Sequence, residues 1–122
     1  MDSLEITLQN RRGDQWPVVA EHRRPGVLPV RGEGRLQFQP GFADFDDFSS
    51  RLTVLLGDPR DYGTCLGEAL FQDSIRDRFM AARAAAGTGG VRILLVVEDP
   101  ALQTLRWERL CAPDGRGGWD FL

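Results

Sequence analysis

One stretch of the chain decides the fold class: residues 91–100 read Val91-Arg92-Ile93-Leu94-Leu95-Val96-Val97-Glu98-Asp99-Pro100. Up to residue 97 its side chains are aliphatic except for one arginine. A near-continuous aliphatic run of this length is typical of a strand that is covered on both faces of a sheet. The Asp-Pro pair ends the run and favours the start of a helix. We therefore expect a buried strand over residues 91–97.

Three helices are expected before this strand. Apolar side chains recur at steps of three and four between residues 45 and 56, which predicts an amphipathic helix ending near Gly57. The next helix is expected to open at Asp58-Pro59, which has the form of an N-cap followed by proline in the first turn. The last of the three is expected to begin at residue 73 or 74 and to stop at Gly87.

The second predicted helix contains two glycines, Gly63 and Gly67, at a spacing of one helical turn. Glycine in a helix interior costs about 1 kcal/mol relative to alanine. Two glycines on one helix therefore indicate that another element of the fold approaches it closely.

The N-terminal region predicts a β-hairpin followed by a short strand. Apolar and polar residues alternate in two runs, which is the period of half-buried strands. The alternating members are Leu4, Ile6 and Leu8 in the first run, and Trp16, Val18, Ala20 and His22 in the second. A turn at residues 11–14 joins the two runs. A loop rich in proline and glycine is expected at residues 25–34, and a short strand at Leu36 and Phe38.

The segment after the aliphatic run places Trp107 and Glu108 between leucines. Tryptophan is large enough to anchor a core. The neighbouring carboxylate is either exposed or buried and satisfied by backbone donors or an arginine, and we favour the second interpretation, an internal brace. Trp119 and Phe121 predict the start of a further strand that continues past the quoted sequence. The chain, residues 1–122, is expected to be a single α/β domain without an internal linker, and an α+β arrangement is the alternative.

The composition excludes several classes of function. The 122 residues are 42% hydrophobic and 27% charged, as expected for one soluble domain. A net charge of −3 provides no positive field to attract nucleic acid. No apolar run is long enough to span a membrane, and Asp2 and Glu5 stand where a signal peptide would carry positive charge. We expect a cytoplasmic protein that binds neither nucleic acid nor membrane.

The residues do not compose a recognisable catalytic or cofactor site. His22 is the single histidine, and the cysteines that it could activate, Cys65 and Cys111, do not lie in glycine-rich exposed turns that present a nucleophile. Both cysteines are expected to be free packing thiols. The glycine-rich residues 87–90 follow a helix and precede a strand, which is the reverse of the order in a phosphate-binding loop.

Two acidic groupings also have structural interpretations. Asp44, Asp46 and Asp47 are expected at the start of a helix, where negative charge complements the helix dipole. Glu98 and Asp99 follow a strand, but no partner for carboxylate chemistry can be named, and Asp99 before proline is an ordinary helix entry. No metal site is predicted.

Three stretches of the chain together resemble the CHAT family of caspase-like peptidase domains. The opening residues 4–8 and 16–19, LEITL and WPVV, are similar to the family's leading hairpin. Residues 62–71, YGTCLGEALF, resemble a helix with the pattern G..L...LF. The most specific stretch joins residues 91–100 to residues 105–110, LRWERL, and is similar to the pattern lRi.L.i..p.L..LPWElL. The signature positions are Leu70, Phe71, Leu105, Trp107, Glu108 and Leu110.

The resemblance implies the leading half of a caspase-like fold. In this family the catalytic histidine and cysteine lie later in the chain, so His22, Cys65 and Cys111 match neither position. Two positions depart from the pattern, since Arg106 stands where proline is usual and Arg109 where leucine is usual. Family relatives are cysteine peptidases that serve bacterial defence and programmed-death systems. The resemblance thus implies a non-catalytic structural or regulatory part of such a peptidase, without a cofactor, packed against the C-terminal protease half.

Other arrangements remain open. The same scaffold fits a standalone adaptor or sensor domain that binds another protein, and an uncovered face would also suit a homodimer. An independent hydrolase that pairs His22 with Cys65 or Cys111 is the least favoured alternative.

Overall fold

The computed structural model describes residues 2–38 and 41–122, which divide into two compact units. The sheet unit comprises Met1–Leu36 and Gln72–Leu105, and the helical unit comprises Gln37–Phe71 and Arg106–Leu122. Each unit is therefore assembled from two separate pieces of the chain. Helices and a mixed sheet together make this an α/β protein, as the sequence predicts.

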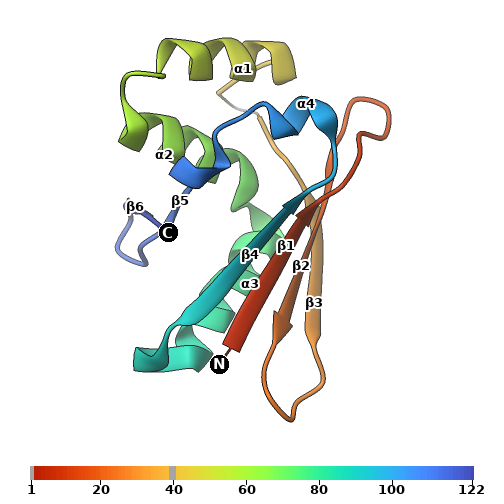
Figure 1. Ribbon diagram of the computed structural model, residues 1–122, viewed down its shortest axis with the longest axis vertical. Coiled ribbons are helices and arrows are strands. Elements are labelled where there is room, and N and C mark those ends of the chain that lie inside the picture. Colours follow the sequence, from red (N-terminus) through yellow and green to blue (C-terminus); the bar gives the residue numbers. More distant parts are fainter. Residues whose placement is uncertain (1, 39–40) are drawn as a thin grey trace. The chain divides into compact units, whose positions relative to one another are not determined.

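The sheet unit is built on a four-stranded sheet in the order β3-β2-β1-β4 (Figure 1). Its elements are β1 (Asp2–Leu8), β2 (Pro17–Arg23), β3 (Val30–Arg35), α3 (Asp73–Ala86), the short 3-10 helix η1 (Gly87–Gly89), β4 (Val91–Val97) and α4 (Pro100–Gln103). β2 is antiparallel to both β1 and β3, whereas β4 is parallel to β1. The predicted N-terminal hairpin is thus confirmed, as is the third helix, which has Gly87 as its C-cap.

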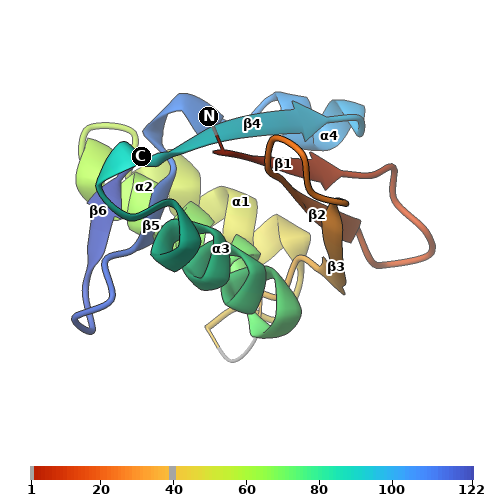
Figure 2. The same cartoon turned by 90° about the horizontal axis from the view of Figure 1, so that it is seen from below.

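Helix α3 packs against one face of the sheet, as Figure 2 shows. The alternating residues of the hairpin point to the buried side, because successive side chains of a strand face opposite ways. The buried residues of β1 and β2 are Leu4, Ile6, Leu8, Val18, Ala20 and His22, and those of α3 are Ile75, Phe79 and Ala82. The core residues of this unit are therefore those predicted by the period of two in the strands and by the helical period in α3.

Strand β3 corrects the loop expected at residues 25–34. The strand lies within that stretch and ends before Leu36, so the prediction of a strand at Leu36 and Phe38 is wrong. The loop is limited to the turn between β2 and β3, where Val27 and Leu28 are exposed and Leu28 reaches an exposed fraction of 86%.

The glycines that suggested a loop are required by the packing of α3 on β3. A Cβ atom on Gly34 would lie 3.0 Å from Cγ1 of the buried Ile75. A Cβ atom on Gly32 would overlap the side chain of Arg78. Both glycines therefore let the helix approach the strand, and the signal for a turn was a signal for close packing.

The helical unit contains two helices, a single-turn helix and a two-stranded sheet. Its elements are α1 (Phe45–Val54), α2 (Pro59–Leu70), the 3-10 helix η2 (Trp107–Arg109), β5 (Cys111–Pro113) and β6 (Trp119–Phe121), with β5 and β6 antiparallel. Both helix starts are confirmed. The Asp44 carboxylate accepts a hydrogen bond from the backbone N–H of Asp47 at 2.9 Å, and that of Asp58 accepts from Asp61 at 3.2 Å.

The close approach predicted for the second helix is confirmed. A Cβ atom on Gly63 would overlap the carbonyl oxygen of Arg109, and one on Gly67 would overlap that of Cys111. The Cβ atom on Gly67 would also lie 2.8 Å from Cζ3 of Trp119. The chain after η2 therefore lies directly on the glycine face of α2.

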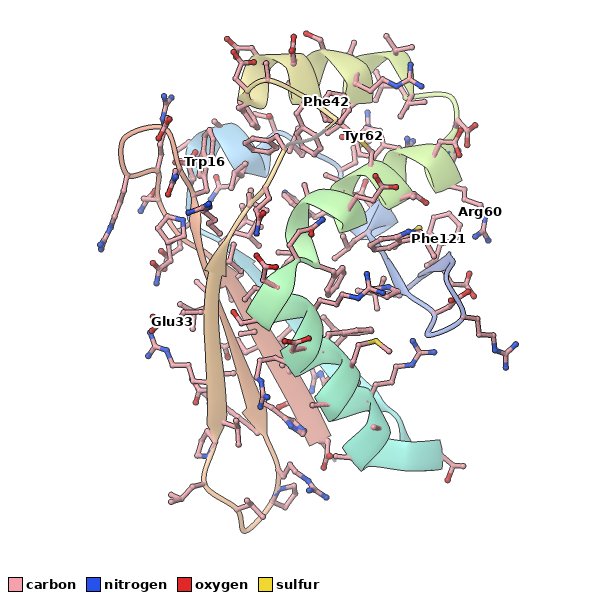
Figure 3. The ribbon with its side chains drawn as sticks, turned by 180° about the vertical axis from the view of Figure 1, so that it is seen from behind. Trp16, Glu33, Phe42, Arg60, Tyr62 and Phe121 are labelled. Carbon is pink, nitrogen blue, oxygen red and sulfur yellow. The ribbon has the colours of Figure 1, made fainter. Side chains whose placement is uncertain are left out.

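Aromatic contacts complete the helical unit. Phe48 lies 4.9 Å from Phe38 and 5.6 Å from Phe42, measured between ring centroids. In Figure 3 the side chains of Arg60 and Phe121 lie beside each other, and the guanidinium carbon is 5.0 Å from the ring centroid. Arg60 also donates a hydrogen bond to the carbonyl of Trp119 at 3.2 Å, which ties β6 to α2.

Within the described residues, every helix is too short or too polar to cross a lipid bilayer.

Candidate interaction surface

Strand β4 forms one edge of the sheet, with β1 on one side and no described strand on the other (Figure 1). Its residues alternate between half-buried and exposed, and the exposed fractions of Leu94 and Val96 are 36% and 42%. The prediction of a strand covered on both faces is therefore wrong. Leu94 and Val96 lie beside Glu5 and Thr7 of β1, on the face of the sheet opposite α3. The aliphatic run indicates a strand that can be buried on both faces, whereas in the structure the face with Leu94 and Val96 is exposed.

The outer edge of β4 offers backbone hydrogen-bonding groups. The N–H of Glu98 donates to the carbonyl of Leu8 at 2.9 Å, so Glu98 points toward β1. Because N–H and C=O directions alternate along a strand, residues 92, 94 and 96 also point toward β1, and Ile93 and Leu95 point outward. At the C-terminal end of this edge the Gln103 side chain donates to the carbonyl of Val97 at 2.9 Å. Unpaired groups thus remain at Ile93 and Leu95 among the described residues.

Little protects this edge against pairing. Natural sheets guard their edges with prolines, bulges, short strands or inward charges. β4 has one charged side chain, Arg92, and Glu98 follows the strand. Both are exposed, and neither takes part in an ion pair among the described residues. The edge is therefore an apolar strand with one positive and one negative end.

The opposite edge of the sheet is guarded. On β3 the side chains of Arg31 and Glu33 form an ion pair at 3.3 Å. The hydroxyl of Ser74 donates a hydrogen bond to the backbone carbonyl of Glu33, whose position is labelled in Figure 3. Three of the six residues of β3 are charged, whereas β4 has one charged residue among seven. The two edges of one sheet therefore differ in their readiness to accept another strand.

The signature positions of the sequence do not form a site for chemistry. Leu70, Phe71 and Leu110 are buried, Leu105 and Trp107 are half-buried, and Glu108 is exposed. The prediction that Glu108 is an internal brace is wrong, because the single turn of η2 directs it to solvent. The same turn leaves Trp107 only half-buried, so it is not the fully enclosed core residue that was expected.

The two arginines around Trp107 have partners of their own. The backbone N–H of Arg106 donates to the hydroxyl of Tyr62 at 2.9 Å. The Arg109 guanidinium lies over the ring of Tyr62, 5.1 Å from its centroid, and donates to the carbonyl of Leu56 at 2.9 Å. Tyr62 of α2 thus holds the η2 turn through two contacts, although no sequence pattern predicted this role for it.

His22 belongs to a buried polar contact in the sheet unit. Its Nε2 lies 3.5 Å from a carboxylate oxygen of Asp2, and the same oxygen lies 3.2 Å from Nε of Arg24. The imidazole therefore connects β2 to the start of β1. This placement agrees with the structural role expected for His22.

The two thiols are free, and their surroundings favour the neutral form. Burial raises the pKa of Cys65 to about 11, the Glu68 carboxylate adds to this, and Arg51 opposes it. Burial also raises the pKa of Cys111, against a hydrogen bond with Thr64 and the charge of Arg60. A nucleophilic cysteine needs a lowered pKa, so both environments suit packing thiols.

Asp99 is a buried acidic residue of the sheet unit, and it caps α4. Its carboxylate accepts hydrogen bonds from the backbone N–H groups of Arg11 and Ala101, both at 2.9 Å. Burial alone would raise the pKa of Asp99, but these hydrogen bonds outweigh it and the pKa is lowered. The interpretation of Asp99-Pro100 as a helix entry is confirmed.

The described residues contain no group of three or more histidine, cysteine or acidic side chains placed to hold a metal ion. The feature with the clearest capacity for recognition is the outer edge of β4. The sequence missed this feature, because a run of aliphatic residues does not reveal whether a neighbouring strand covers it. The polar Glu5 and Thr7 in the adjoining strand were the available signal, since a strand next to a fully buried one is expected to be apolar on both faces as well.

Comparisons with known proteins found no match among protein-family models, curated proteins or solved structures.

Proposed function

We propose that this chain is a non-catalytic structural or regulatory part of a CHAT-like cysteine peptidase, which packs against a catalytic half through the edge of β4. The observation that carries the proposal is an aliphatic parallel strand at an open edge of the sheet. A parallel strand with such a sequence is normally interior to a sheet. A further strand from the catalytic half would pair with Ile93 and Leu95 and remove Leu94 and Val96 from water.

The chemistry of the chain supports a non-catalytic role. Both thiols have raised pKa values, and His22 is engaged with Asp2. The resemblance to caspase-like peptidases of defence and programmed-death systems rests on residues 4–8 with 16–19, on residues 62–71 and chiefly on residues 91–110. It supplies the identity of the proposed partner, a polypeptide that carries the catalytic histidine and cysteine.

The proposal is tested by binding. The polypeptide encoded after Leu122, if it carries histidine and cysteine motifs, is titrated with the chain in a calorimeter. Association is expected, together with peptidase activity that requires the catalytic polypeptide and is absent from the chain alone. Leu94→Arg should weaken the association, whereas Val30→Arg at the guarded edge should not. Absence of association, or activity in the chain alone, would contradict the proposal.

A second candidate is a standalone adaptor, and the turn between β2 and β3 favours it. The N–H of Val27 donates to the carbonyl of Arg24 at 3.2 Å, and Gly26 has a φ of 75°, so Pro25-Gly26 forms a tight turn that holds Leu28 outward. An exposed leucine next to such a turn suits an apolar pocket in another protein. If Leu28→Ser abolishes binding to a partner and Leu94→Arg does not, the adaptor is the better description.

A further inference from the structure

We propose that two copies of this chain join through their β4 strands, antiparallel about a two-fold axis at Leu94, so that two sheets become one. The inference concerns the chain by itself and does not rest on the proposed function. It does use the same edge, so pairing with a second copy and pairing with a catalytic half exclude each other.

The backbone determines the register of this pairing. Outward-pointing residues must meet outward-pointing residues, because only they have free N–H and C=O groups at this edge. With Leu94 on the axis, Ile93 of one copy meets Leu95 of the other, and each such pair exchanges both backbone hydrogen bonds. The groups left unpaired in one copy are thereby satisfied by the second.

The side chains are complementary in the same register. Leu94 meets its own copy in a non-hydrogen-bonded pair, where side chains approach most closely. Arg92 meets Val96, and Glu98 of the other copy becomes a diagonal neighbour of Arg92 on the same face. Both charged residues are exposed in the single chain, so the two-fold axis places opposite charges within reach twice. A self-complementary arrangement of this kind is what an interface between identical copies requires.

In this dimer a second copy of the chain covers an edge that is exposed in the single chain. Leu94 and Val96 are partly exposed in the single chain, and pairing would bury them against the second copy. The cap of Gln103 on the Val97 carbonyl lies at the end of the paired segment and leaves Ile93 and Leu95 free. The geometry therefore points to a short, central and symmetric contact.

The first test is the mass of the chain in solution. Sedimentation equilibrium over a concentration series is expected to give twice the chain mass of 13.6 kDa. Leu94→Arg places two guanidinium groups against each other on the axis and should weaken dimerisation at least about tenfold. Val30→Arg makes the same kind of change at the β3 edge, at a similarly exposed position, and should leave dimerisation unchanged. A wild-type monomer at all concentrations, or a dimer insensitive to Leu94→Arg, would overturn the proposal.

Two further measurements fix the register and do not depend on a loss of function. Arg92→Glu should weaken the dimer by placing two acids together, and Arg92→Glu combined with Glu98→Arg should restore it. Leu94→Cys should form a disulfide-linked dimer under mild oxidation, because its copy lies directly opposite, while Val30→Cys should not. Failure of the charge exchange to rescue, or equal cross-linking at both positions, would refute this register. Neither result depends on whether a catalytic half binds, so the proposed function is judged separately.

Discussion

The sheet unit and the helical unit each depend on a pair of glycines, but the glycines face different kinds of neighbour. Gly32 and Gly34 of β3 face side chains of α3. Gly63 and Gly67 of α2 face backbone carbonyl oxygens of the segment after η2. A side chain can change its rotamer, whereas a peptide group is held by the chain on both sides. We therefore expect glycine substitutions to destabilise the helical unit more than the sheet unit.

The largest effect is expected at the helix of the helical unit. Gly63→Ala gains helix propensity, but its Cβ would overlap the Arg109 carbonyl oxygen. We expect a net loss of about 3 kcal/mol in the free energy of unfolding, measured by urea titration. Gly57→Ala is the control in the same unit, since nothing lies within 4 Å of its Cβ position, and its effect should stay within about 0.5 kcal/mol. Equal effects of the two changes would contradict the comparison.

In the sheet unit, the Asp99 carboxylate also has backbone neighbours, since it accepts hydrogen bonds from the N–H groups of Arg11 and Ala101. Asp99→Ala removes the N-cap of α4 and leaves the backbone N–H of Arg11 without its acceptor. A loss of about 2 kcal/mol in the free energy of unfolding is expected. Thermal unfolding of the variant and the wild type measures it. A loss below about 0.5 kcal/mol would show that the structure around Asp99 adjusts to a substitution at least as readily as the side chains between α3 and β3.

The same carboxylate should make the stability of the chain depend on acid. The pKa of Asp99 is lower in the folded state than the value of about 3.9 in an unfolded chain. The unfolded state therefore binds the proton first, so the contribution of Asp99 is complete above about pH 5 and is lost as the pH falls through the folded pKa. Urea titrations at a series of pH values should show this loss in the wild type and a reduced dependence in Asp99→Asn. An identical pH dependence in both chains would assign the effect to other carboxylates.

The smallest effects are expected at the glycines of β3. In Gly34→Ala the new Cβ meets the buried Ile75, which has little room to move, and a loss of about 1 kcal/mol is expected. In Gly32→Ala it would overlap Cγ of Arg78, which clears the methyl group only if χ1 of that helical residue changes, so the loss should be at least as large, about 1 to 2 kcal/mol. Urea titration of both variants measures these losses. A cost at Gly32 equal to that at Gly63 would remove the distinction between side-chain and backbone neighbours.

The sequence predicted those elements whose signal is local. The hairpin, the three helices, the cap at Asp58, and the close approach to the glycines of α2 follow from periodicity, capping and helix propensity, and all are present. β3 was missed because glycine indicates both turns and close packing, and only the position of α3 decides between them. The exposure of β4 and of Glu108 was missed because burial depends on neighbours that lie far away in the sequence.

The candidate surface was harder to predict than the fold. Residues 91–97 were recognised as a strand, and the sequence also left open an uncovered face and a homodimer. Which edge is open depends on the strand order, and the free backbone groups depend on the register between β1 and β4. A single sequence contains neither quantity, so Ile93 and Leu95 had no distinguishing signal.

The ion pair of Arg31 with Glu33, and the hydrogen bond from Ser74 to the Glu33 carbonyl, have a consequence for assembly. They leave the sheet with one edge, β4, at which another strand can pair, and one edge, β3, at which pairing is disfavoured. Once β4 is occupied, each end of the joined sheet is a β3 strand, whose charged side chains disfavour the addition of a third chain. A protein that carries a long aliphatic edge can therefore associate in pairs and still avoid forming a fibre.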